Sequence, residues 1–232
     1  MYHNPVLLKE CLEGLDIQPD GVYVDVTFGG GGHSKAILAC LGEKGRLFAF
    51  DQDPDARANA EAINDKRLTF VDANFRYLQK YLRLYGVKQV NGILGDLGVS
   101  SHQFDTPERG FSTRFEASLD MRMNPRIGKT ARDIIDNYTV EELHRIFGMY
   151  GELQNAKTAA QAIVAARANR SIETVTDLKT ALQRFAPRGK ENKYFAQVFQ
   201  ALRIEVNEEM AVLQEFLTQS AEVLKPQGRL VV

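Results

Sequence analysis

The sequence predicts a doubly wound parallel α/β sheet with a mostly helical domain inserted between its fourth and fifth strands. Short β-branched runs alternate with helical patterns over the first part of the chain, which indicates βαβ units. That alternation then stops, and helical patterns alone fill the chain until a last short apolar run. A run of glycines directly follows the first expected strand, as at the first turn of doubly wound sheets.

The elements of the first half follow in a regular order. We expect strands over residues 22–26, 46–50, 68–71 and 90–94, each a short run rich in β-branched and aromatic residues. Helices are expected over residues 34–41, from about Pro54, and over residues 75–85, since proline suits the first turn of a helix.

The second half begins with an irregular loop over residues 103–128, rich in Pro, Gly, Arg and Asp. Helical patterns follow at 130–137, 140–149, 153–168 and 174–185. Apolar residues at steps of three and four then predict one long helix over residues 195–224. A turn at 226–228 precedes a fifth strand over residues 229–232. We therefore expect one domain over 1–105 and 205–232, and the inserted helical domain over 106–204.

The chain ends within that fifth strand. Sheets of this type usually continue with one or two further strands, so we expect the natural protein to extend beyond Val232.

The composition, 44% hydrophobic and 25% charged, is that of a soluble globular protein. The sequence has no apolar run long enough to span a membrane. Its first residues do not have the pattern of a secretory signal peptide. Cys11 and Cys40 are isolated in the sequence, so we expect neither a metal site nor a disulfide. We therefore expect the protein to reside in the reducing cytoplasm.

Charge is unevenly distributed. Residues 106–204 carry 16 Lys and Arg against 11 Asp and Glu, whereas the remainder carries 13 against 19. This excess is a weak indication of a polyanionic partner, and on charge alone a normally solvated surface is the favoured explanation.

The glycine run Gly29–Gly32 allows a tight turn and a close approach of the backbone to a ligand. Asp51 closes the next strand, where a carboxylate can accept both hydroxyls of a ribose. Because His33 and Ser34 follow the glycines, a phosphate-binding Gly-Lys-Ser/Thr loop is excluded. A nicotinamide-binding site would need a third glycine, which this loop lacks. S-adenosylmethionine needs a glycine loop and a ribose-binding carboxylate, and the sequence supplies both. A glycine-rich turn that binds no ligand is the remaining alternative.

Five motifs, which follow one another along the chain, restrict the choice of ligand further. They are Thr27–Ser34, Gly95–Gln103, Arg109–Ser112, Leu119–Met123 and Phe199–Asn207. In these motifs the chain resembles the bacterial 16S rRNA (cytosine-N4)-methyltransferase family along essentially its whole length. The resemblance implies a class I methyltransferase sheet, S-adenosylmethionine as methyl donor, and N4-methylation of a cytidine in the decoding centre of the small ribosomal subunit. No metal is expected, since His33 has no second His or Cys nearby to complete a metal site.

The resemblance also implies site residues. Gly31, Gly32 and His33 would contact the cofactor and Asp51 would hold its ribose. Phe75 would lie against the adenine, although its pattern alone indicates a core aromatic residue. Asp96 and Gln103 would complete the pocket. The inserted domain would recognise 16S rRNA, and oligomeric state is left open.

The chain departs from the family in one motif. Residues 193–197 read Lys-Tyr-Phe-Ala-Gln where the family commonly has His-Pro-Ala-Thr-Arg. Gln197 thus replaces a cation, which puts an RNA contact at that position in doubt.

The catalytic residue is expected to be Asp96, a carboxylate at the carboxyl end of the fourth strand, where open α/β sheets place their ligands. Methylation of ring carbon would need a nucleophile, normally a cysteine, and neither cysteine follows a strand.

Phe104 and Phe111 are candidates for the wall against a flipped base, and loop packing explains each equally well. The densest basic cluster, expected to bind phosphates, is Arg184, Arg188, Lys190 and Lys193.

Overall fold

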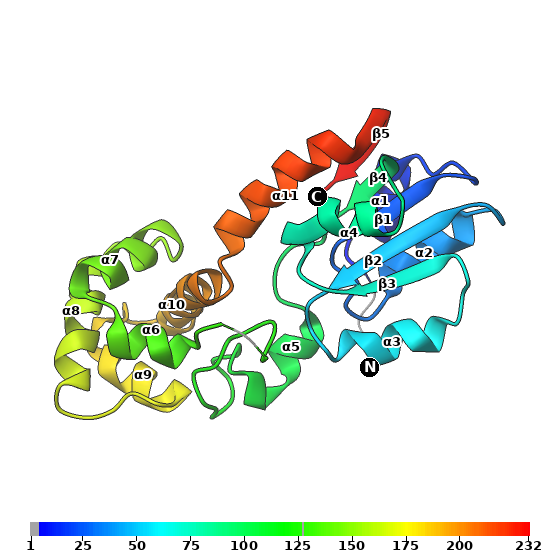
Figure 1. Ribbon diagram of the computed structural model, residues 1–232. Helices are drawn as coiled ribbons and strands as arrows, with labels where there is room; N and C mark the ends of the chain where they lie inside the picture. The colour runs from blue at the N-terminus through cyan, green and yellow to red at the C-terminus, as the bar shows by residue number, and fades with distance from the viewer. Residues whose placement is uncertain (1–4, 127) are drawn as a thin grey trace. The chain divides into compact units, whose positions relative to one another are not determined.

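The structure, a computed structural model, describes residues 5–126 and 128–232. The chain divides into two compact units (Figure 1): Met1–Ser100 with Met210–Val232, and Ser101–Glu209. The sequence placed these divisions after residues 105 and 204, five residues away at each crossing. Within the described residues, none of the helices is long and apolar enough to cross a bilayer.

The first unit is built on a five-stranded sheet in the order β3-β2-β1-β4-β5, with every pairing parallel. Its strands are β1 (Val22–Asp25), β2 (Arg46–Asp51), β3 (Leu68–Asp72), β4 (Val90–Leu94) and β5 (Leu224–Val231). The order reverses between β1 and β4, so the predicted doubly wound parallel sheet is confirmed. This reversal is the switch point at which sheets of this kind bind ligands.

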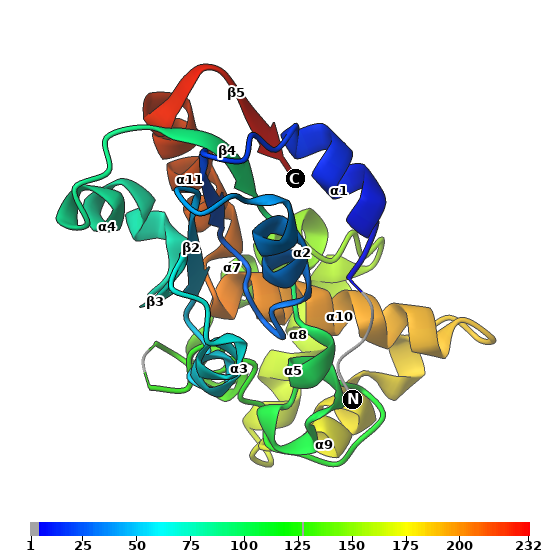
Figure 2. The same cartoon turned by 90° about the vertical axis from the view of Figure 1, so that its right-hand side faces the viewer.

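Helices cover both faces of this sheet. They are α1 (Leu8–Leu15), α2 (Gly32–Cys40), α3 (Ala56–Ile63), α4 (Leu78–Leu84) and α11 (Glu209–Val223), with the 3₁₀ turn η1 (Phe75–Tyr77) before α4. Helix α1 was not expected from the sequence. Its residues Leu12 and Leu15 pack with Ile37 of α2, and Figure 2 shows the two helices beside each other.

Alternation of side chains along the strands divides the core into two layers. Val24, Phe48 and Phe50 point to the face covered by α4 and α11. Tyr23 and Leu47 point to the opposite face, under α1 and α2. Because both faces are buried, the inner strands β1, β2 and β4 are mostly apolar, as buried parallel strands are.

Strand β5 is longer than expected and irregular. Leu224 pairs with Val90 of β4, and the register resumes only when Arg229 pairs with Gly92. Residues 225–228 bulge between these pairs, and Gln227 adopts a left-handed φ of 67°. The predicted turn at 226–228 therefore lies inside the strand.

The second unit is helical, as predicted. Its elements are α5 (Ser101–Asp105), η2 (Pro107–Arg109), α6 (Ala131–Asn137), α7 (Val140–Met149), α8 (Ala156–Arg167), α9 (Val175–Leu182), η3 (Gln183–Phe185) and α10 (Glu191–Val206). Threonines begin three of these helices, and each forms a capping box with an acidic residue three positions on. The pairs are Thr130 with Asp133, Thr139 with Glu142, and Thr174 with Asp177.

The expected single helix over 195–224 is wrong. It is broken between α10 and α11, where Glu208 adopts a left-handed φ of 50°. The Asn207 side chain turns back to donate to the Arg203 carbonyl at 2.9 Å, and Arg203 pairs with Glu209 across the break. Apolar periodicity continued through the break because α10 and α11 are each buried on one face.

Asn207 also holds the irregular loop of this unit. Its amide donates to the Met121 carbonyl at 2.8 Å and accepts from the Met123 N–H at 2.7 Å. Met121 is fully buried in a left-handed conformation, with φ of 60°. Such a conformation is strained for a residue with a side chain, so the Asn207 bonds help to hold it.

Candidate functional site

Three carboxylates lie at the carboxyl edge of the sheet. Asp25 ends β1 and Asp51 ends β2, while Asp96 follows β4 by two residues. These three strands flank the point where the strand order reverses. A ligand in this position would meet several acidic side chains and the glycine loop between β1 and α2.

The glycine loop is fixed by side chains of the neighbouring β2–α3 region. The Gly29 N–H donates to Asp51 Oδ2 at 2.7 Å, and the Gly29 carbonyl accepts from Asn59 Nδ2 at 3.1 Å. Gly29 and Gly31 both adopt left-handed φ values, 50° and 76°. A Cβ at Gly31 would lie 2.8 Å from the Phe28 ring, so this position requires glycine.

Asp51 is held in place and keeps capacity for a ligand. Its other oxygen, Oδ1, accepts from the Asp53 N–H at 2.8 Å. A carboxylate has about four acceptor positions, so two stay available for the hydroxyls of a ribose. Burial raises the pKa of Asp51 to about 6, even though the N–H groups of Asp53 and Gly29 lower it.

Asp25 organises the interior of the site and was missed from the sequence. It is fully buried and accepts from Ser34 Oγ at 2.7 Å and from the Thr27 N–H at 3.0 Å. Desolvation raises the pKa of this carboxyl. The Thr27 hydroxyl in turn accepts the Asp96 N–H at 2.8 Å. Asp25 therefore links the first turn of α2 to the backbone at Asp96.

Gly32 and His33 meet the segment that precedes α1. A Cβ at Gly32 would lie 2.4 Å from Pro5 Cγ. The His33 ring is buried, and its Nε2 lies 3.0 Å from the Val6 carbonyl. Its side chain is thus engaged by the protein, which leaves the backbone N–H groups at the start of α2 as the donors available to a cofactor.

Phe75 lies in η1, beyond the end of β3. Its ring meets the Phe216 ring edge to face at 5.2 Å and packs on the core between the sheet and α11. The core packing that its pattern indicated is present, and its side chain is only partly buried. A contact with adenine stays a prediction.

Asp96 is exposed, and its backbone is anchored through Thr27. Gln103 lies in α5 of the other unit and is buried, with 5% of its surface exposed. The sequence resemblance groups both residues in one pocket, and for Gln103 this stays a prediction.

The two candidate aromatic residues for base stacking differ in exposure. Phe111 is buried at 5% exposed, whereas Phe104 is 38% exposed with the Arg114 guanidinium 5.0 Å from its ring centre. Phe104 is therefore the better candidate for a contact with a base.

The four residues of the basic cluster, Arg184, Arg188, Lys190 and Lys193, are all exposed. Gln197, which replaces a cation of the family, instead donates to the Glu152 carbonyl at 3.4 Å. It thereby ties the turn between α7 and α8 to α10, which is a structural use of this position.

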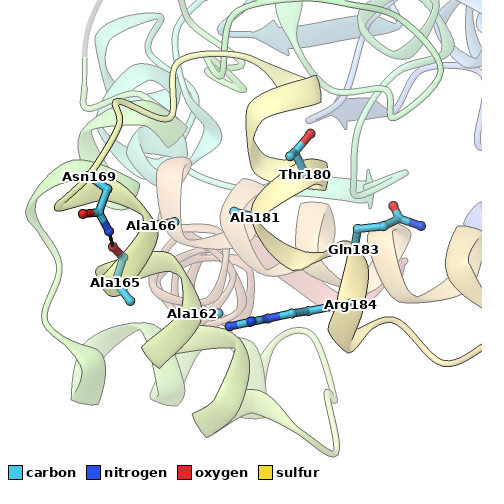
Figure 3. A pocket seen from close by; sticks show the side chains of 8 residues that line it. All are labelled: Ala162, Ala165, Ala166, Asn169, Thr180, Ala181, Gln183 and Arg184. Carbon is cyan, nitrogen blue, oxygen red and sulfur yellow. Dashed lines mark hydrogen bonds between the residues drawn. The ribbon is translucent and has the colours of Figure 1, made fainter.

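A hollow of about 510 Å³ lies between α8 and α9 (Figure 3). Four alanines contribute to its lining, and the polar lining residues are Asn169, Thr180, Gln183 and Arg184. Its lining includes no carboxylate, histidine or cysteine, so it offers no group for acid–base or nucleophilic chemistry. Arg184 also belongs to the basic cluster, which favours an anionic neighbour here.

In the described part of the chain, no three or more His, Cys, Asp or Glu side chains are grouped so as to hold a metal ion.

Comparisons with known proteins bear on the identity of this site. The chain is 61% identical over 232 residues to the ribosomal RNA small subunit methyltransferase H of Cytophaga hutchinsonii, covering all of this chain and 78% of that protein. It is 57% identical over 231 residues to the enzyme of the same name from Flavobacterium johnsoniae, covering 76% of it. Aeropyrum pernix fibrillarin, solved with bound S-adenosyl-L-methionine, is 16% identical with a TM-score of 0.30 over 47% of this chain and 51% of its own. That structural likeness is too low to add to the assignment.

The match to the MraW methylase family extends over residues 1–232, and the two relatives align along the whole chain. The parallel sheet and the inserted helical unit are those expected of a class I methyltransferase. The glycine loop and Asp51 occupy the ligand-binding edge of that sheet. This chain therefore belongs to the MraW methylase family.

Proposed function

We propose that this protein transfers the methyl group of S-adenosylmethionine to the exocyclic N4 of a cytidine in the decoding centre of 16S rRNA. The observation that carries the cofactor assignment is the pairing of Asp51 with Gly29 at 2.7 Å, because it joins a ribose-binding carboxylate to the glycine loop. The whole-chain identity to proteins named small subunit rRNA methyltransferases supports the substrate.

The residues present fit such a cofactor. Gly31 supports a cofactor site at the start of α2. Its left-handed φ and its crowded Cβ position require glycine, so no side chain covers the backbone there. The free N–H groups of that first turn suit the carboxylate of the methionine moiety. Asp51 suits the ribose hydroxyls, and the partly buried Phe75 suits the adenine face. The fit covers the three chemically distinct parts of the molecule.

When bound, S-adenosylmethionine supplies a methyl group activated by its sulfonium. The residues of this chain then have to place an amine in line with that methyl and exclude water. Asp96 would accept a hydrogen bond from one N4 hydrogen and take that proton as the N4–CH3 bond forms, while the bond between sulfur and the methyl group breaks and S-adenosylhomocysteine leaves as a neutral thioether. The Thr27 hydroxyl, bonded to the Asp96 N–H at 2.8 Å, would hold that carboxylate in position.

The two cysteines support nitrogen over ring carbon as the acceptor, Cys40 by its position and Cys11 by the protonation of its thiol. Cys40 is exposed at the last position of α2, the end of that helix away from the glycine loop. Cys11 is partly buried within α1, and its thiol pKa is raised, chiefly by burial and further by Asp96. A raised pKa keeps a thiol protonated, which is the wrong state for attack on a ring carbon.

The second unit would provide the contacts to rRNA. Its exposed cluster of Arg184, Arg188, Lys190 and Lys193 suits phosphate groups, and the exposed Phe104 suits a base.

The test is methylation of small ribosomal subunits from cells that lack the modification, using S-adenosylmethionine labelled in its methyl group. Digestion of the rRNA and mass spectrometry of the nucleosides should reveal label on one cytidine, with the fragment ions placing it on the base nitrogen. Label on C5, on a ribose, or on none of the nucleosides would contradict the proposal.

Asp51→Ala should weaken binding of S-adenosylmethionine by about 100-fold in calorimetry, since it removes two hydrogen bonds to a charged acceptor. Asp20→Ala is the matched control, because Asp20 is an exposed aspartate just before β1, at the opposite edge of the sheet. Equal affinities for the two variants would remove Asp51 from the site.

A further inference from the structure

The segment that precedes α1 is docked on the glycine loop. Pro5 packs on Gly32 so closely that a Cβ there would lie 2.4 Å from its ring. The Val6 carbonyl lies 3.0 Å from His33 Nε2 and also faces the Cys11 thiol at 3.8 Å. A buried histidine, a glycine and a cysteine therefore fix the backbone of this segment at two successive residues.

The conformation of the segment is specific. Leu7 adopts a left-handed φ of 47°, which is costly for a leucine and persists only where the surroundings impose it. Yet Val6 and Leu7 are 63% and 64% exposed, so burial of their own side chains does not explain the strain. The segment therefore presents two exposed apolar side chains from a backbone that contacts with Gly32, His33 and Cys11 hold in place.

The segment lies on the β4 and β5 side of the sheet, where the methyl-transfer half of the proposed site would be. Asp51 and Phe75, which suit the nucleoside, belong to the β2 and β3 side of the sheet. Helix α1 instead packs on β4 and β5, and a Cβ at its Gly14 would lie 3.1 Å from Val231. The Cys11 thiol, which faces the Val6 carbonyl at 3.8 Å, has its pKa raised chiefly by burial and further by the charges of Asp96 and Asp25. Cys11 and the Val6 backbone beside it therefore lie within electrostatic range of the proposed catalytic carboxylate.

We propose that Pro5–Leu7, held by the His33 side chain, forms a wall of the methyl-transfer site, with Val6 and Leu7 contacting the cytosine ring of the flipped nucleotide. The proposal rests on the proposed function and assigns the substrate side of the same site. His33 is a positioning residue in this account, since its imidazole acts through the Val6 carbonyl. A flipped base is typically read against apolar side chains, and these two are suitably exposed.

The wall itself is tested by Val6→Thr combined with Leu7→Asn. Both replacements keep the size of the side chain and add polarity, and asparagine tolerates a left-handed φ. We expect KM for small subunits to rise about tenfold, with the Kd for S-adenosylmethionine within about threefold of the parent value. Leu84→Asn in α4 is the matched control, because Leu84 is 73% exposed on the same unit.

The positioning role is tested by His33→Ala and His33→Gln. Glutamine places an N–H donor near the position of Nε2, so it should recover most of the loss in kcat/KM that alanine causes. Equal losses for alanine and glutamine would remove the Val6 contact from the account. Thermal unfolding of each variant identifies any that fail to fold.

The outcomes separate the two proposals. An inactive parent protein would overturn the proposed function, and this inference with it. An active parent with unchanged kinetics for the Val6→Thr, Leu7→Asn variant would overturn the wall alone. A loss confined to binding of S-adenosylmethionine would overturn it as well, because the segment would then contact the cofactor rather than the base.

Discussion

The Asp51 carboxylate and the Gly29 N–H are joined by a hydrogen bond of 2.7 Å that connects the end of β2 to the glycine loop after β1. Through this bond Asp51 has two structural roles. It fixes the left-handed turn at Gly29, and it orients the carboxylate that the proposed ribose would meet. The pKa of Asp51, raised to about 6 by burial, makes both roles sensitive to pH.

Cofactor affinity should therefore fall as the pH drops through about 6, because the protonated carboxyl loses an acceptor for the ribose hydroxyls. Below that value the Kd should rise by up to about tenfold per pH unit. Calorimetry between pH 5 and pH 8 checks this, and Asp51→Asn should show a flatter profile. A parent profile as flat as that of the variant would mean that Asp51 does not bind the ligand.

The unliganded fold responds in the opposite direction. The pKa of Asp51 is raised above its ordinary value of 3.8, so folding favours the protonated form. The contribution of this group to stability is present below pH 3.8 and is lost as the pH rises through about 6. Bound cofactor would offset that loss.

Much of the sheet could be predicted because buried parallel strands and the glycine bend have strong local signals. Asp51 was identifiable since it closes a strand after a glycine run. Asp25 and Asn59 were not, because their roles depend on contacts with Ser34 and Gly29 that only the folded chain brings together. The role of the His33 side chain was missed for the same reason, as its partner Val6 lies 27 positions away in the chain.

The break between α10 and α11 shows another limit of periodicity. Apolar steps of three and four describe burial, and they continue when a chain leaves one buried helix and enters the next. The break depends on Asn207, whose side chain satisfies a loop more than 80 residues earlier. Helix α1 was missed although Leu8, Cys11, Leu12 and Leu15 follow helical spacing, because that pattern spans only eight residues and precedes the first strand.

Asn207→Ala should destabilise the second unit by about 3 kcal/mol, since it removes bonds to Met121 and Met123 and leaves partly buried backbone groups unpaired. Chemical denaturation followed by circular dichroism measures the change. Asn192→Ala is the matched control, because Asn192 is an exposed residue of α10 and should change stability by less than about 0.5 kcal/mol. A similar small change for both variants would mean that the clamp on the loop is unimportant.

Phosphate contact by the basic cluster predicts a strong salt dependence of RNA binding. Arg188→Gln should lower the slope of log K against log salt by about 0.7 to 0.9, the value for one lost phosphate contact. Lys44→Gln serves as the control, because Lys44 is also exposed and lies before β2 in the first unit. A parent slope close to zero would mean that phosphate contacts do not drive binding.

Asp96→Ala should lower kcat on small subunits by at least about 100-fold at saturating S-adenosylmethionine, because the N4 hydrogens lose their acceptor. The backbone of Asp96 offers a finer test. Thr27→Val keeps the size of the side chain but removes the oxygen that accepts the Asp96 N–H, so kcat should fall about tenfold. Thr27→Ser keeps that oxygen and should retain most of the rate. If valine and serine gave the same kcat, the Thr27 hydroxyl would have no part in placing Asp96, and a normal rate for Asp96→Ala would remove this carboxylate from the chemistry.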